Sequence, residues 1–257
     1  MVATTSPRAD RARLLRFDGV ERALHWVNAA LFLILIGTAS ILYVGPLSAA
    51  VGRRELVRQV HVWSGIALPV PLLVAVAGRW GRGFRADISR FNRWTKDDGR
   101  WFRTLGRDPY VQLGKFNPGQ KLNASFIAGV IVVMLGTGAV MNWFHYFPVD
   151  WRTGATFVHD WVAVILFVVV VGHIGFALAD PDSLGSMLRG TVDAGWARGH
   201  HPGWYEEELR SDSESVVVGE VTRDLDVGDG APPGQPQQHL AGRTGDAAAG
   251  RAFPEEV

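Results

Sequence analysis

Four apolar segments, separated by charged stretches, constrain the fold of this chain more than any other feature. A helix of about 20 predominantly apolar residues is long enough to cross the hydrocarbon core of a bilayer. Because backbone polar groups in lipid must be satisfied within the segment, such windows are expected to be helices. The pattern predicts an all-α membrane protein, a bundle of four transmembrane helices. The segments are Trp26–Leu47, Val60–Trp80, Leu122–Phe144 and Phe157–Ala179.

Two of these segments have a second interpretation. The second contains Pro69 and Pro71, and its uninterrupted apolar part, Gly65–Gly78, is short enough for a buried helix of a soluble protein. Membrane helices tolerate proline, so a span is still expected. The first segment follows an Arg-rich start, as in a secretory signal peptide. Its apolar run is longer than the usual h-region of about 7–15 residues, which favours a retained span.

Positive charges are unevenly distributed among the loops. Five arginines precede residue 24 and eleven Lys and Arg residues lie from Arg79 to Lys121, but only three lie in 48–59 and one in 144–156. Lys and Arg mark the cytoplasmic side of a membrane protein. The distribution predicts a multi-pass protein whose two termini and loop 80–121 are cytoplasmic.

Composition divides the chain into three parts. Residues 1–24 form a cytoplasmic N-terminal segment, 25–209 the four-helix domain with its loop 80–121, and 210–257 a tail. The tail carries a net charge of −5, whereas residues 1–209 carry +6. Its charge and its Gly- and Pro-rich composition predict a mostly disordered cytoplasmic segment. Only VVVGEVTRDLDV within it has the pattern of a short strand or docking segment.

The loop 80–121 contains DISRFNRWTKDDGRWFRTLG, in which aromatic and charged residues alternate. This pattern predicts an amphipathic helix that lies against lipid headgroups. Mixtures of basic and aromatic residues also bind nucleic acid, but a loop between two membrane spans is a poor place for that function. We therefore expect the lipid bilayer, and no nucleic acid, as the partner of this loop.

The chain has no cysteine, eight histidines and four methionines. The absence of cysteine excludes disulfides, thiolate-held iron–sulfur clusters, thiolate zinc sites and covalent c-type haem. A bound metal must therefore use histidine, methionine or carboxylate ligands.

The fourth apolar segment carries two histidines, His159 and His173, fourteen residues apart. Ionisable groups inside a membrane are costly and usually functional. Fourteen residues of α-helix rise about 21 Å and turn about 40° short of four full turns, so both imidazoles leave nearly the same face. The helix thus presents one histidine near each membrane surface.

Two further histidines complete the pattern. His25 opens the first segment on the cytoplasmic side, and His61 opens the second on the outer side. The depths match in pairs, His25 with His173 and His61 with His159. A b-type haem needs two axial imidazoles from facing helices, so the sequence predicts two haems stacked across the bilayer. The alternative is that each histidine is an ordinary interfacial residue, the interpretation that we give to His145.

Other uses of these histidines fit less well. Zinc needs three or four ligands in one small sphere, and ligands about 21 Å apart cannot share it. A proton pathway would need buried carboxylates, and Asp160 is the only one near a histidine in the spans. Glycines near the ligands would leave room for a macrocycle, although they also suit close helix packing. They are Gly37, Gly65, Gly136, Gly138, Gly172 and Gly175.

Several motifs in this four-span layout resemble a known family. ERALHW (21–26), QVHVWSG (59–65) and the HDW…GH pair resemble the bacterial cytochrome b subunits of membrane formate dehydrogenases and Ni-Fe hydrogenases. GKFNPGQK (114–121) is similar to a signature of the formate dehydrogenase gamma subunit, with Pro118 in place of a smaller residue. ARGHHPGWYEEE (197–208) resembles the cytoplasmic C-terminal region of that subunit. The resemblance covers roughly residues 14–209.

The resemblance implies roles for individual residues. His25 and His173 would ligate the inner, cytoplasmic-side haem b, and His61 and His159 the outer haem b. A quinone, expected to be menaquinone, would bind near the inner haem. The residues implied for the quinone are Asn117, Gly119, Gln120 and His173, with Lys121 as a further polar group. The residues Asn117–Pro118–Gly119 also have the pattern of a turn that starts the third span.

The resemblance also implies partners and a function. The chain would be the electron-transfer subunit of a respiratory formate dehydrogenase in the bacterial inner membrane, without catalytic residues for formate oxidation. Electrons would come from an iron–sulfur beta subunit, supplied by a Mo- or W-containing alpha subunit, and would leave to the quinone. The alternatives are the cytochrome b subunit of a Ni-Fe hydrogenase or another respiratory oxidoreductase, and a haem-free membrane anchor.

Overall fold

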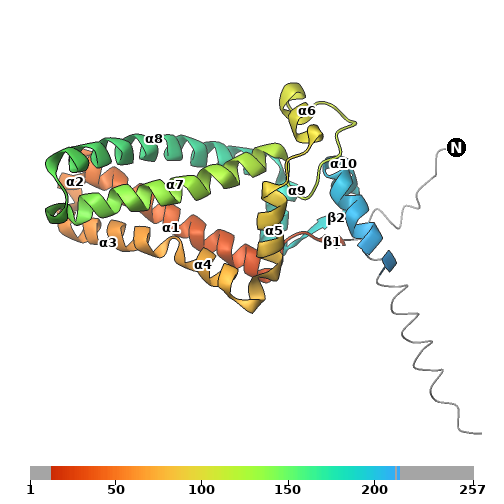
Figure 1. The fold of residues 1–257 in the computed structure, drawn as a ribbon, viewed down its shortest axis with the longest axis horizontal. Coiled ribbons are helices and arrows are strands. Elements are labelled where there is room, and N and C mark those ends of the chain that lie inside the picture. Colours follow the sequence, from red (N-terminus) through yellow and green to blue (C-terminus); the bar gives the residue numbers. More distant parts are fainter. Residues whose placement is uncertain (1–12, 212, 215–257) are drawn as a thin grey trace, which may run out of the picture. The chain divides into compact units, whose positions relative to one another are not determined.

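The computed structural model of the chain describes residues 13–211, 213 and 214 (Figure 1). The chain divides into two units, Met1–Arg210 and Ser211–Val257, and the architecture below belongs to the first. The predicted disorder of the tail and the segment VVVGEVTRDLDV lie outside the described residues. The predicted domain boundaries at 24/25 and 209/210 stay predictions.

Four long apolar helical spans run side by side in Figure 1, which confirms the predicted four-helix architecture. Helices α1 and α3 pack together, α7 packs along α8, and α3 contacts α7. All four spans are long and apolar enough to cross a membrane. They are α1 (Gly19–Tyr43), α3 (Arg54–Ala67) continued by α4 (Val70–Ala77), α7 (Pro118–Asn142) and α8 (Val149–Ala179).

The prolines of the second span divide it into two helices. Helix α3 ends with Leu68 as its C-cap, and α4 begins after Pro69, with Pro71 in its first turn. Proline has no backbone N–H and its ring collides with the preceding turn, so an interior proline interrupts the helix. The first turn of a helix tolerates it because the N–H there has no intrahelical partner.

All four spanning helices begin earlier than hydropathy predicts, and polar capping boxes start two of them, α1 and α7. In α1, Asp18 Oδ1 accepts a 2.8 Å bond from Glu21 N, and Glu21 Oε2 accepts a 2.7 Å bond from Asp18 N. Asn117 and Gln120 exchange equivalent bonds of 2.9 and 3.0 Å at the start of α7. This confirms the predicted turn before the third span. Pro118 is the first residue of α7, a favoured position for proline.

The remaining elements lie at the two ends of the bundle (Figure 1). At one end are α2 (Gly45–Val51) and the short helix η2 (Phe144–Tyr146). The other end carries η1 (Arg79–Gly81), α5 (Arg82–Asn92), α6 (Lys96–Thr104), α9 (Pro181–Arg189) and α10 (Ala194–His200). Residues 202–211 are also helical. The predicted amphipathic stretch of the long loop thus forms two helices, α5 and α6.

The all-α expectation missed one small sheet. Strand β1 (Arg13–Leu15) pairs antiparallel with β2 (Thr191–Asp193), with Leu14 opposite Val192. Val192 also belongs to a compact apolar cluster with Trp196, Ala197 and Trp204. The sheet and this cluster attach the residues before α1 to the segment after α9, at the end of the bundle that also carries the GKFNPGQK loop.

Candidate functional site

The four predicted histidines meet in two pairs. The ring centroids of His25 on α1 and His173 on α8 lie 6.2 Å apart. Those of His61 on α3 and His159 on α8 lie 6.3 Å apart. Each pair therefore joins α8 to a helix from the first half of the chain, at two different levels of the bundle.

The spacing within each pair suits a metal ion held between two imidazoles. Two collinear metal–nitrogen bonds of about 2.0–2.1 Å, with about 1.15 Å from each nitrogen to its ring centroid, would separate the two centroids by about 6.3–6.5 Å. The observed distances are 6.2 and 6.3 Å. Both pairs thus fit the axial ligation of a b-type haem without movement of either helix.

Four of the six predicted glycines have no atom close to the position that a Cβ would occupy. A Cβ on Gly37, Gly136, Gly172 or Gly175 would meet no atom within 4 Å. Of the other predicted glycines, Gly138 faces His159 at 3.5 Å and Gly65 faces Leu35 at 3.8 Å. The donor set of each pair fits a b-type haem, and these four glycines would not obstruct a planar macrocycle.

Sequence reasoning missed two threonines that contact the outer pair. Thr38 Oγ1 lies 2.9 Å from His61 Nδ1, and Thr137 Oγ1 lies 2.9 Å from His159 Nδ1. A signal for them exists in the chain. The first span contains IGTAS (36–40) and the third LGTGA (135–139), so Gly-Thr recurs at nearly the same distance before His61 and His159.

At the end of the bundle next to His25 and His173, which we call the inner end, Lys115 of the GKFNPGQK loop is buried within an ionic cluster. Its Nζ donates to Glu21 Oε1 at 3.2 Å and to Asp87 Oδ2 at 2.6 Å. Arg90 donates a further 2.9 Å bond to Asp87. Glu21 lies one turn before His25 on α1, so the cluster links the loop and α5 to the helix that carries an inner histidine.

The predicted quinone residues of the loop have structural contacts. The side-chain oxygens of Asn117 and Gln120 are used in the capping box of α7, which leaves their amide NH2 groups as donors. Gly119 lies beside this cap, where a Cβ would approach Asn117 Oδ1 to 3.3 Å. Lys121 Nζ donates to Arg93 O and to both carboxylate oxygens of Asp98, all at 2.9 Å, so its three donors are used.

The ARGHHPGW segment is joined to the same loop through His201 and Arg16. His201 Nδ1 donates a 2.6 Å bond to Gly114 O, and its Nε2 lies 3.4 Å from Arg16 Nη2. Burial, reinforced by the Arg16 charge, lowers the pKa of His201 to about 3. Burial likewise lowers the pKa of Arg16 to about 10. A neutral His201 therefore accepts from Arg16 while it donates to the loop.

Arg16 has further contacts that tie the N-terminal strand to this end of the bundle. Its guanidinium donates to Ser183 Oγ at 3.1 Å and to Lys115 O at 3.3 Å. It also lies 4.7 Å from the ring centroid of Trp196, a cation–π distance. Three segments distant in sequence, which contain Lys115, Ser183 and Trp196, thus share one buried arginine.

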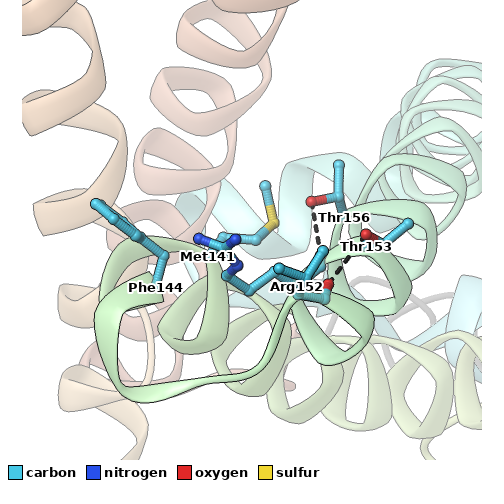
Figure 2. Close-up of a pocket in the computed structure, with 6 residues that line it drawn as sticks. Met141, Phe144, Arg152, Thr153 and Thr156 are labelled. Atoms are coloured by element: carbon cyan, nitrogen blue, oxygen red, sulfur yellow. Dashed lines mark hydrogen bonds between the residues drawn. The ribbon is translucent and has the colours of Figure 1, made fainter.

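A cavity of about 290 Å³ lies at the opposite end, between the end of α7 and the start of α8 (Figure 2). Its lining residues are Met141, Phe144, Val149, Arg152, Thr153 and Thr156. The Arg152 guanidinium lies 5.7 Å from the Phe144 ring centroid, and its Nε is buried without a partner in the described structure. His145, expected to be interfacial, packs nearby on Tyr146 with ring centroids 3.9 Å apart.

Comparisons with known proteins agree with this architecture. The chain is 27% identical over 209 residues to the formate dehydrogenase cytochrome b556(fdo) subunit of Escherichia coli strain K12, which covers 77% of this chain and 94% of the relative. The nitrate-inducible cytochrome b556(Fdn) subunit of the same strain is 27% identical over 221 residues, or 79% and 97% of the two chains. The Haemophilus influenzae formate dehydrogenase cytochrome b556 subunit is 27% identical over 220 residues, or 81% and 89%.

The sequence pattern of one family covers most of the described bundle. It matches residues 16–190, which include all four spans and all four paired histidines. The match begins at the buried Arg16 and ends at Gly190, whose carbonyl accepts bonds from Arg16 N and Phe17 N. The chain belongs to the prokaryotic cytochrome b561 family.

Proposed function

We propose that this chain is the electron-transfer subunit of a respiratory formate dehydrogenase and carries electrons across a bacterial inner membrane to a quinone. The observation that supports this most is the pair of histidine–histidine contacts, at 6.2 and 6.3 Å, at two levels of one apolar bundle. The cytochrome b subunits of formate dehydrogenase that resemble the chain support the identity of the complex.

Four histidines would hold two b haems. His25 and His173 would ligate the inner one, and His61 and His159 the outer one. When bound, the haems would supply one-electron redox chemistry that no side chain of the bundle provides. The protein contributes the axial ligands, an apolar surrounding and hydrogen bonds to the ligands, which are the means by which a protein sets a haem potential.

The quinone would bind at the inner end, near His173 and the start of α7. The amide NH2 groups of Asn117 and Gln120 would donate to a quinone oxygen, since their side-chain oxygens are used in the helix cap. Gly119 would allow close approach to the backbone. A quinone reduced at this end would take its two protons from the cytoplasm, and inward electron movement would then build a membrane potential.

The partners would lie on the outer side. We infer that an iron–sulfur beta subunit delivers electrons near His61 and His159, and that formate is oxidised in a Mo- or W-containing alpha subunit. Both termini and the α5–α6 region would be cytoplasmic, as the distribution of Lys and Arg indicates. Menaquinone is the acceptor that we expect.

Two measurements test this proposal. Purified protein should contain two b haems per chain by the pyridine haemochrome assay, and a preparation with none would support the haem-free anchor instead. Affinity purification from membranes should recover an iron–sulfur subunit together with formate:quinone activity. Recovery of hydrogen-dependent activity in its place would assign the chain to a hydrogenase.

A further inference from the structure

The two outer histidines have the same hydrogen-bond partner in two halves of the chain. Thr38 on α1 contacts His61 on α3, and Thr137 on α7 contacts His159 on α8, each at 2.9 Å through Nδ1. The sequence separations are nearly equal, 23 and 22 residues. Each threonine follows a glycine whose missing side chain leaves open space, Gly37 and Gly136.

The positions of the hydroxyl protons follow from the remaining contacts. Thr38 Oγ1 lies 2.7 Å from Ile34 O, and Thr137 Oγ1 lies 2.7 Å from Val133 O. A carbonyl oxygen cannot donate, so each hydroxyl uses its only proton on the preceding turn of its own helix. The hydroxyl can then only accept from the histidine. Both imidazoles must therefore carry their proton on Nδ1.

This tautomer leaves the lone pair of each imidazole on Nε2, on the other side of the ring. A neutral imidazole binds a metal through its unprotonated nitrogen, and the other ring nitrogen usually donates to a neighbouring acceptor. The threonines thus hold both outer histidines in the form that can ligate iron. Neither ring can turn over without breaking a bond to the facing helix.

The inner pair lacks this arrangement. Within the described part of the chain, no side chain is hydrogen-bonded to the ring of His25 or His173. His25 has an aromatic neighbour instead, Trp26, with ring centroids 5.2 Å apart. The two predicted haem sites therefore differ in the partners of their axial ligands, although their ring-to-ring distances are nearly equal.

We propose that Thr38 and Thr137 are positioning residues that fix the outer ligands and lower the reduction potential of the outer haem relative to a site without them. The inference rests on the proposed ligation by His61 and His159. A hydrogen bond from Nδ1–H makes the imidazole a stronger base, which stabilises the more positive, oxidised iron. The difference favours electron movement from the outer site to the inner one.

The test uses the full-length protein purified with its haems. The reduction of the haems is followed by visible absorbance as the solution potential is changed, and each haem gives one redox transition. Thr38→Val and Thr137→Val keep the shape of the side chain and remove the hydroxyl acceptor. His61 retains the backbone of Leu35 as a partner in Thr38→Val, so Thr137→Val should have the larger effect. Each should move only the outer transition to a more positive potential, or weaken retention of the outer haem by about 10–100-fold. The outer transition is identified as the one that is lost in His159→Ala.

Two kinds of variant separate this role from simple packing. Thr38→Ser and Thr137→Ser retain the hydroxyl and should restore the wild-type potential and haem content. Thr153→Val is the matched control, because Thr153 also donates to the carbonyl one turn earlier, at 3.0 Å, in a helix that carries a ligand. It should leave both transitions unchanged.

The results distinguish this inference from the proposed function. Wild-type protein without two b haems would refute the proposed ligation itself. Wild-type protein with two haems, combined with valine variants whose outer potential and haem content are unchanged, would refute the role of the threonines alone. The same conclusion would follow if serine failed to rescue the valine variants, or if the inner transition shifted as much as the outer one.

Discussion

Lys115 Nζ and Asp87 Oδ2 lie 2.6 Å apart, and both side chains are buried at the inner end of the bundle. Glu21 accepts from the same ammonium group, so one lysine joins buried carboxyl groups from α1 and α5, and Arg90 is a second cation on Asp87. The pairing explains why a lysine in the GKFNPGQK motif is retained inside the protein: it holds the loop, α1 and α5 in one arrangement.

Removal of this lysine should strongly destabilise the inner end. In Lys115→Met, Glu21 and Asp87 would be buried without their shared partner, and breaking a buried ion pair in this way costs about 3–5 kcal/mol. Thermal unfolding of the detergent-solubilised protein should show a clear decrease in Tm. The control is Glu55→Gln, which removes the exposed pair between Glu55 and Arg58 and should leave the Tm nearly unchanged, because solvent screens an exposed pair. Equal effects of the two variants would contradict the assignment of a structural role to Lys115.

Replacement of single histidines should remove haems selectively. His61→Ala or His159→Ala should eliminate the outer haem only, and His25→Ala or His173→Ala the inner haem only, because each pair supplies both axial ligands of one site. The pyridine haemochrome assay should then find one haem per chain, and redox titration one remaining transition. His145→Ala is the control and should retain both haems, because His145 packs on Tyr146 away from either pair. Loss of the same transition in all four variants would contradict two separate sites.

The contribution of His201 to the stability of the inner end should be lost at acidic pH. Glu21 acts in the opposite direction, because burial raises its pKa to about 7, so the His201 contribution is measured by comparison with a His201 variant. The pKa of His201 is about 3 in the folded protein, because burial and the Arg16 charge oppose protonation, compared with about 6.5 when exposed. Between these two pKa values, His201 is protonated in the unfolded chain but neutral in the folded chain. The free energy of unfolding therefore decreases as the pH falls from about 6.5 towards 3. The expected slope is at most about 1.4 kcal/mol per pH unit.

Tryptophan fluorescence during thermal unfolding can follow this effect, since Trp196 lies 5.2 Å from the His201 ring. His201→Gln, which cannot titrate, should flatten the dependence of Tm on pH in this window, whereas exposed His145→Gln should not. Parallel curves for His201→Gln and wild type between pH 6.5 and 4 would show that another group is responsible.

The sequence predicted the features that depend on local composition. Hydropathy located the four spans, and residue type with helical periodicity located the paired histidines. Hydropathy placed the starts of all four spans too late. At α1 and α7 the reason is that Asp18–Glu21 and Asn117–Gln120 form polar first turns that it does not detect. The turn at Asn117 was nevertheless predictable from its Asn-Pro-Gly pattern.

Contacts between distant segments could not be predicted in the same way. Strands β1 and β2 are three residues each and join positions 178 residues apart, so neither has a periodic signal of its own. The partners of Lys115 lie 94 and 28 residues away. Thr38 and Thr137 look like ordinary helix residues whose hydroxyls bond to the preceding turn, and only the repeated Gly-Thr suggests more.

Asn117 allows the structural role of the GKFNPGQK loop to be separated from its proposed role at the quinone. Asn117→Ala removes the N-cap of α7 and should cost about 0.5–2 kcal/mol, with a lower Tm. Asn117→Asp keeps an acceptor for Gln120 N, so the cap and the Tm should be retained, but it loses the amide NH2. If that NH2 donates to a quinone oxygen, Asn117→Asp should raise the KM for quinone in the assembled complex, with haem content unchanged. Unchanged quinone kinetics at wild-type stability would limit Asn117 to its helix cap and place the quinone elsewhere at the inner end.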